Sequence, residues 1–263
     1  MESSVILKAA ISFVVAGFWI AGATLLAERL GSRGGGLIAN LPSNILVSML
    51  FVALSQSVSF ASEATRAVPI GMAIDTVFLF IMIVTLRHGL LVSVLLSTAG
   101  WFLLAFTAGK YQYSGWIINI AIYIIIVILS FLVLEYLLRI ASAERIKRSY
   151  NMRQVLFRAG FAGSIVAGTV IISELASPFW TGLFATFPAV LLSTMVILTI
   201  NQSVDFARAA GKILIFSSSN IVIYAVAIHY LYPTAGLILG TLLAFAAALL
   251  WILIFRPAVK KLS

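Results

Sequence analysis

Nine apolar runs of about 20 residues each follow one another along the chain, and this pattern constrains the fold more than any other feature. They lie near 6–28, 35–56, 67–86, 88–108, 115–139, 155–174, 180–201, 211–230 and 234–256. With 62% apolar and 10% charged residues and a mean hydropathy of +1.15, the chain has too little polar surface for a soluble domain. We therefore predict an all-α polytopic membrane protein with nine transmembrane helices, embedded in a lipid bilayer.

The basic residues indicate how these spans are oriented. If the N-terminus lies outside, three of the 17 Lys and Arg residues fall outside, namely Lys8, Arg66 and Lys110. The other fourteen fall inside, and they are Arg29, Arg33, Arg87, Arg139, Arg145, Lys147, Arg148, Arg153, Arg158, Arg208, Lys212, Arg256, Lys260 and Lys261. This positive-inside bias predicts a prokaryotic cytoplasmic membrane protein with its C-terminus inside. The net charge of +9 then reflects orientation and lipid headgroup contact, and no nucleic-acid partner is expected.

Shifting the chain by 146 positions brings two segments into register without a gap. Residues 21–61 share 14 identities in 41 positions with residues 167–207, including Glu, Gly, Pro and Gln residues that apolar composition does not explain. Each copy holds four spans, and the unmatched span 115–139 separates them. An odd number of spans lies between the two starts, so the second copy enters the membrane from the opposite side.

The predicted architecture is therefore two inverted four-helix repeats joined by a linker helix. The expected units are a first repeat (1–113), a linker helix with a basic loop (114–150) and a second repeat (151–263). Inverted repeats of this kind form substrate sites near the midplane and favour alternating access. They also occur in channels and in some proteins that do not transport.

Ionisable residues inside a span are costly, which makes each one a functional candidate. Asp75 lies roughly 12 Å into its span at 1.5 Å per residue, deeper than any other carboxylate. At the matching depth, the second copy carries Ser217, Ser218, Ser219 and Asn220. Glu28 and Glu174 occupy equivalent positions, as interfacial residues or as a shared site for H⁺ or Na⁺. These residues are the predicted substrate- and ion-binding set, and their acidity favours a cation or a neutral solute, because no basic residue is expected deep enough to bind an anion.

Two equivalent motifs, Gly36-x-x-Ala39-x-x-Pro42 and Gly182-x-x-Ala185-x-x-Pro188, fall early in the second and seventh spans. A proline inside a helix removes a backbone donor and kinks or breaks it. Broken helices at corresponding positions of two halves point to a transporter binding site. The N-termini of the half-helices carry partial positive charge, so such a site could also bind an anion. An ordinary packing kink is the alternative interpretation.

Three further features complete the polar inventory. Gln56 and Gln202 end the second and seventh spans, either as helix caps or as gates. Glu135 and Arg139 stand four residues apart and are expected to form a helical ion pair. With no cysteine, two histidines and no hydrolase, P-loop or zinc-protease motif, we expect no metal site, no cofactor other than a coupling ion, and no enzymatic activity.

One segment of the second copy resembles a known family. Thr181 to Pro188, followed by Ile213-Leu214-Ile215-Phe216 and His229-Tyr230-Leu231, is similar to the GlpM-like family of small four-helix bacterial membrane proteins. The first copy matches less well, since Leu41 replaces the Phe before the proline, and Ser217 stands where the family tends to have Gly. The resemblance implies a fused tandem of a four-helix unit, a loose association with exopolysaccharide production, and no particular substrate.

The leading functional hypothesis is a secondary transporter for a small solute, coupled to H⁺ or Na⁺. A scaffold or accessory subunit of envelope-polysaccharide assembly and a passive channel are the alternatives. A homo-oligomer is left open.

Overall fold

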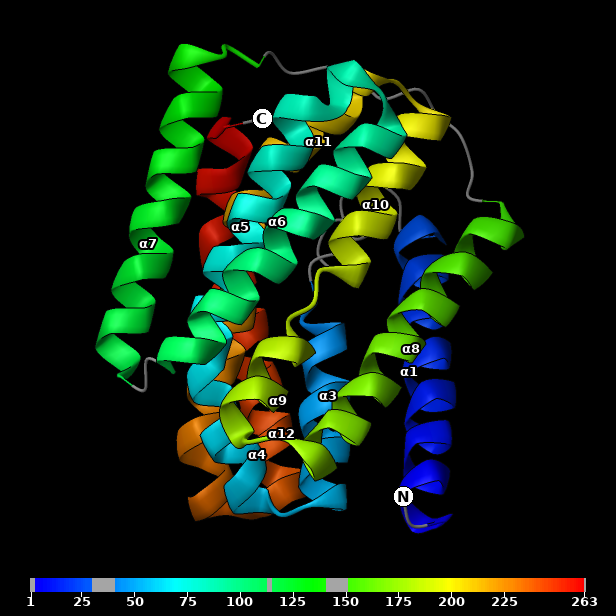
Figure 1. Ribbon diagram of the computed structural model, residues 1–263, viewed down its shortest axis with the longest axis vertical. Helices are drawn as coiled ribbons and strands as arrows, with labels where there is room; N and C mark the ends of the chain where they lie inside the picture. Colours follow the sequence, from blue (N-terminus) through cyan, green and yellow to red (C-terminus); the bar gives the residue numbers. More distant parts are fainter. Residues whose placement is uncertain (1–2, 30–40, 113–114, 141–150, 263) are drawn as a thin grey trace.

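The computed structural model describes residues 3–29, 41–112, 115–140 and 151–262, and these residues form an all-helical bundle (Figure 1). Short 3₁₀ turns at Thr65–Ala67 and Leu86–His88 flank α5, and a π-helical turn at Val133–Leu137 extends α7. The α-helices are α1 (Ser3–Arg29), α3 (Ser43–Ser55), α4 (Val58–Ala64), α5 (Val68–Thr85), α6 (Leu90–Tyr111), α7 (Trp116–Leu132), α8 (Met152–Leu175), α9 (Pro178–Ala185), α10 (Ala189–Asn201), α11 (Val204–Ser217) and α12 (Ser219–Leu262).

Seven of the described helical segments are long and apolar enough to cross a membrane. They are Ser4–Leu26, Val58–His88, Leu90–Tyr111, Trp116–Leu137, Met152–Leu175, Pro178–Asn201 and Val204–Ile254. Large apolar side chains such as Phe18, Ile117 and Ile254 are more than two-thirds exposed on their outer faces. Since lipid can accept such side chains and water cannot, the chain is a multi-pass helical membrane protein.

Two local features account for the difference between these seven segments and the nine predicted spans. Val204–Ile254 does not run straight, because Gly236 takes φ 75° and ψ −178°, a conformation that favours glycine. Figure 1 shows α12 descending to one end of the bundle and returning. The second feature is α3, whose 13 residues reach only about 20 Å. The predicted span 35–56 also includes residues that lie outside the described part.

The backbone of α3 matches that of α10 under the shift of 146 residues. Both helices have 13 residues, and Pro42 (φ −75°, ψ 50°) and Pro188 (φ −77°, ψ 44°) precede them with nearly the same dihedral angles. Proline suits this position because it has no N–H to leave unbonded and its φ is preset. In Figure 1 the two helices start near the middle of the bundle and run toward opposite ends.

The turns that follow these two helices also match. Ser57 Oγ accepts the backbone N–H of Phe60 at 3.0 Å, and Ser203 Oγ accepts that of Phe206 at 3.1 Å. Each serine thus caps the next helix, α4 or α11, by the same N-cap bond. The local sequence therefore specifies the same helix–turn–helix twice.

The two halves of the chain pack closely through small residues. Helix α1 lies antiparallel to α8 (Figure 1), and a Cβ on Gly163 would come within 2.8 Å of the carbonyl oxygen of Phe13. Gly182 in α9 approaches the Ala64 carbonyl so closely that a Cβ would overlap it. Such contacts replace the hydrophobic effect as the source of helix association in lipid.

Candidate functional site

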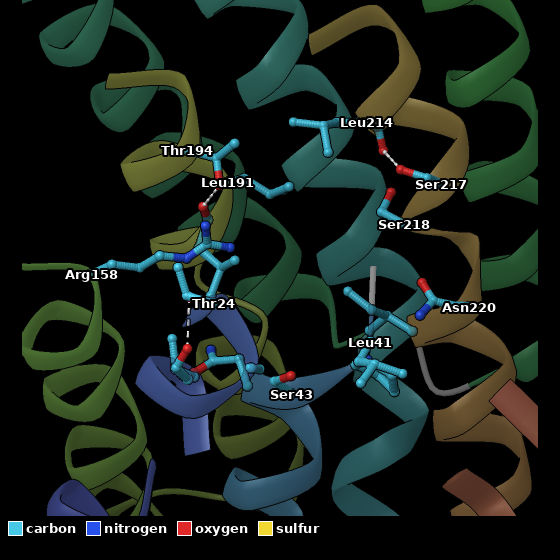
Figure 2. A pocket seen from close by; sticks show the side chains of 16 residues that line it. Thr24, Leu41, Ser43, Arg158, Leu191, Thr194, Leu214, Ser217, Ser218 and Asn220 are labelled. Atoms are coloured by element: carbon cyan, nitrogen blue, oxygen red, sulfur yellow. Dashed lines mark hydrogen bonds between the residues drawn. The ribbon is translucent and has the colours of Figure 1, made fainter. Parts of the chain in front are cut away.

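A cavity of about 160 Å³ lies where α3 and α10 begin (Figure 2). Helices α1, α8, α11 and α12 complete its walls. The described residues that line it are Ile20, Ala23, Thr24, Leu41, Pro42, Ser43, Asn44, Arg158, Val190, Leu191, Thr194, Leu214, Ser217, Ser218, Asn220 and Ile221.

The N-terminal turns of α3 and α10 face this cavity. Pro42 and Pro188 give no side-chain cap to α3 and α10, and the first helical bonds run from Leu46 N to Pro42 O at 2.9 Å and from Leu192 N to Pro188 O at 2.7 Å. The first amides of a helix have no acceptor within it, and they carry the positive end of the helix dipole. The cavity therefore lies between two partial positive charges.

Arg158 supplies a full positive charge to the same space. Its side chain extends from α8 toward Thr194 of α10 (Figure 2), and the residue is only 9% exposed. Among the described residues that line the cavity, Arg158 carries the only formal charge. From the sequence, Arg158 was counted with the inner basic residues and was not named as a site residue, whereas the structure buries it in the cavity wall. The available signal was its place between Val155, Leu156, Phe157 and Ala159, apolar on both sides.

Most hydroxyl protons at the cavity are already donated to the backbone. Thr24 Oγ1 donates to Ile20 O and Thr194 Oγ1 to Val190 O, both at 2.7 Å, and Ser218 Oγ donates to Ile215 O at 3.1 Å. Their oxygens can still accept. Asn44 Nδ2 donates to Ala185 O at 3.4 Å, while its buried Oδ1 makes no hydrogen bond. The neutral polar groups therefore offer acceptors to a ligand.

The structure brings part of the predicted serine cluster to this cavity. Ser217, Ser218 and Asn220 line it at the junction of α11 and α12. Ser219 does not line the cavity. Its Oγ instead accepts a 2.9 Å hydrogen bond from Trp251 Nε1. The cluster therefore divides between a cavity wall and a helix contact.

Asp75 does not line the cavity. It is 2% exposed in α5, and Oδ1 accepts a 2.8 Å hydrogen bond from Trp101 Nε1 in α6. The Trp101 ring packs edge-on against Phe187, with ring centroids 4.9 Å apart. Since Phe187 precedes Pro188, a chain of contacts joins Asp75 to the break between α9 and α10.

Of the two predicted glutamates, Glu174 does not line the cavity. Glu174 is exposed at the end of α8, where one carboxylate oxygen accepts a 2.8 Å hydrogen bond from Ser55 Oγ. Glu28 belongs to the last turn of α1, and its side chain lies outside the described part of the structure.

The predicted hinge and gate residues occupy different places. Pro188 lies where α9 gives way to α10, whereas Gly182 lies within α9 at a close helix contact and not at the break. Gly36 lies outside the described residues. Gln56 and Gln202 follow the last turns of α3 and α10, and their N–H groups donate to Val52 O and Leu198 O at 2.8 and 2.9 Å.

A second buried cation belongs to an ion pair. Lys212, 4% exposed, donates to Glu135 Oε2 at 2.7 Å and to Ile140 O at 2.8 Å. The predicted pairing of Glu135 with Arg139 was wrong: the π-helical turn changes the helical register, and Arg139 takes φ 46°. Within the described ranges, no three His, Asp or Glu side chains gather where they could hold a metal ion.

The fold and the site define a polytopic helical membrane protein with a largely apolar cavity at the starts of α3 and α10. Residues 9–114 match a family described as "Protein of unknown function (DUF3147)". No curated protein and no solved structure matches the chain.

Proposed function

We propose that the protein is a secondary transporter that works by alternating access, moving a small solute with H⁺ or Na⁺ as the coupling ion. The observation that carries this proposal is the largely apolar cavity at the N-termini of α3 and α10, whose wall also holds polar side chains such as those of Thr24, Asn44 and Thr194. Non-helical backbone at membrane depth is tolerated where it lines a cavity, and paired broken helices are typical of transporter sites.

Two inverted repeats of four helices, with nine membrane crossings in all, are part of the proposal. Its support is the agreement of α3 with α10 and of the starts of α4 and α11 under one shift of 146 residues, with opposite directions in Figure 1. Counting α3 with its preceding segment, and dividing α12 at Gly236, turns seven long apolar segments into nine. The family match at 9–114 nearly coincides with the proposed first repeat, 1–113. The GlpM-like resemblance would then describe the same repeat unit.

Asp75 is our candidate for the coupling residue. A charged carboxylate buried in an apolar bundle has a high free-energy cost. Binding a proton or a cation at Asp75 removes that cost, so it can change the relative stability of two conformations. Trp101 and Phe187 join Asp75 to the start of α10, which borders the cavity. Glu28 and Glu174 are second candidates at the membrane surfaces.

We place the protein in a prokaryotic cytoplasmic membrane with its N-terminus outside. The support is that α1 and α5 end, and α8 and α11 begin, toward one end of the bundle (Figure 1), and that basic residues belong to each of these helix ends, namely Arg29, Arg87, Arg153 and Arg208.

The test is solute-driven proton or sodium flux in proteoliposomes, with a pH- or Na⁺-sensitive dye inside and a panel of small solutes added outside. We expect saturable flux with one class of solute and its loss in Asp75→Asn, with Asp205→Asn, which alters an exposed carboxylate, as the control. Flux that rises linearly with concentration would indicate a channel. An absence of flux with every solute would contradict the transporter proposal and favour the scaffold hypothesis.

A further inference from the structure

We propose that two equivalent hydrogen-bonded contacts, one at each end of the bundle, are the closures that open in turn during transport. The outer closure joins Lys8 to Ser55, and the inner closure joins Gln154 to Asn201. This inference rests on the proposed transport function and deepens it by naming residues that control access to the cavity. The separation of the closing helices can be measured without any solute, so the two proposals can fail separately.

The outer closure lies where α3 ends, beside the first turns of α1 and the end of α8 (Figure 1). Lys8 Nζ of α1 donates a 3.2 Å hydrogen bond to the carbonyl oxygen of Ser55, the last residue of α3. Ser55 Oγ donates at 2.8 Å to a carboxylate oxygen of Glu174 in α8. Ser55 therefore joins the end of α3 to both α1 and α8.

The inner closure lies toward the opposite end of the bundle, where α10 ends beside the start of α8 (Figure 1). Gln154 Nε2 donates to Asn201 Oδ1, and Asn201 Nδ2 donates to Gln154 Oε1, both at 2.8 Å. Gln154 Oε1 also accepts the backbone N–H of Asn151 at 3.2 Å, as part of the capping box of α8. The last residue of α10 is therefore held by a side chain that the helix cap keeps in place.

The shift of 146 residues relates the two closures position by position. It pairs Lys8 with Gln154 and Ser55 with Asn201, although the side chains differ in type. The same two places of the repeated segment thus make an interhelical hydrogen bond in each half of the chain. Two different chemistries at equivalent positions indicate that the contact itself, and not one particular residue pair, is what both halves require.

Helices α1 and α8 form the framework on which both closures lie. A Cβ on Gly163 would lie 2.8 Å from the carbonyl oxygen of Phe13, and a Cβ on Gly17 would lie 3.6 Å from that of Ala159. These contacts are again equivalent, because the shift relates Gly17 to Gly163 and Phe13 to Ala159. Small residues at a helix contact let two backbones pack closely. The closures therefore lie at the two ends of one tightly packed helix pair.

Each closure holds the far end of a helix that starts at the cavity. Helices α3 and α10 have 13 residues, about 20 Å, and begin after Pro42 and Pro188. The break before each helix can act as a hinge, so the far end can move away from α1 and α8 once its closure opens. Opening one closure then exposes the cavity toward one surface while the other closure stays formed. Both closures are formed in the structure, which fits a state between the two openings.

The experiment measures separations at both closures by pulsed electron paramagnetic resonance, on the full chain in phosphatidylcholine nanodiscs. Since the chain has no cysteine, two label pairs can be introduced separately. Ile6→Cys with Leu54→Cys reports on the outer closure, and Met152→Cys with Ile200→Cys reports on the inner one. All four positions are exposed, and the shift of 146 residues relates one label pair to the other.

Breaking each closure should lengthen one distance only. In Asn201→Ala we expect a longer component at the inner label pair and no lengthening at the outer pair. The ratio of open to closed populations should rise about 3- to 10-fold, the change expected for the loss of one or two hydrogen bonds. Lys8→Met combined with Ser55→Ala should give the reverse. Ser164→Ala, which removes a hydrogen bond within α8, is the control and should change neither distribution.

Unchanged distances in either variant, or lengthening at both label pairs, would overturn the proposal. Asn201→Ser covers the case in which the alanine variant does not fold. Its shorter side chain keeps at most one of the two bonds, so the inner distance should lengthen to a smaller extent, and wild-type distances would contradict the inner closure. Distances that respond without coupled flux of any solute would reject the transport proposal and keep the closures, whereas coupled flux with unresponsive distances would do the reverse.

Discussion

Trp101 Nε1 donates a 2.8 Å hydrogen bond to Asp75 Oδ1, and Asp75 is only 2% exposed. The two residues lie on α5 and α6, neighbouring helices of the first half. A buried polar group is most costly when it loses its partner, so the pair behaves as a unit.

We first predict that Trp101→Phe destabilises the protein by about 1–3 kcal/mol, because Asp75 is left without its donor. Adding Asp75→Leu should offset much of this loss, since both polar groups are then gone. Chemical unfolding in detergent micelles measures both changes. Trp19→Phe, at a half-exposed position, should cost less than about 0.5 kcal/mol. Additive losses in the double variant would contradict the coupling of these two residues.

The Lys212–Glu135 pair predicts an unequal response to removal of each partner. Glu135→Gln leaves the Lys212 charge buried at 4% exposure and should cost about 3 kcal/mol. Lys212→Met leaves a carboxylate that is 37% exposed and can reach water, so it should cost about 1 kcal/mol. Thermal unfolding of the two variants gives the order. Glu63→Gln, which breaks the exposed pair with Arg66, is the control and should be near neutral. The opposite order would show that Glu135 and not Lys212 is the buried partner.

Gly182 predicts a steric effect. Gly182→Ala places a methyl group into the Ala64 carbonyl and should destabilise the protein by about 1–3 kcal/mol. Gly22→Ala meets nothing within 4 Å and should stabilise α1 by up to about 1 kcal/mol, through the higher helix propensity of alanine. The folded fraction after purification and the unfolding midpoint measure both. A neutral Gly182→Ala would mean that α9 and α4 can move apart at no cost.

The sequence predicted the features that follow from local chemistry. Pro42 and Pro188 precede helices because proline restricts its own residue and the turn before it, whatever surrounds them. The deep burial of Asp75 followed from its place in an apolar run.

Long-range contacts escaped prediction for a physical reason. Glu135 pairs with a lysine 77 residues away, and Gly182 meets a carbonyl of another helix, so neither contact leaves a local pattern. Arg158 was not recognised as a cavity residue because counting charges by loop ignores the direction of a side chain. It lies two turns into α8, where an arginine can reach inward as easily as toward the surface.

The central claim, alternating access around two equivalent half-helices, is tested most directly by single-cysteine labelling. The chain has no cysteine, so Asn44→Cys and Val190→Cys, the equivalent second residues of α3 and α10, each provide a single site in the cavity wall. Reactivity toward an impermeant maleimide is measured from each side of oriented proteoliposomes, with an ion gradient in either direction and without one. We predict that these conditions raise reactivity from one side and lower it from the other at both positions. Reactivity from both sides at once, or from one side under all conditions, would contradict the account.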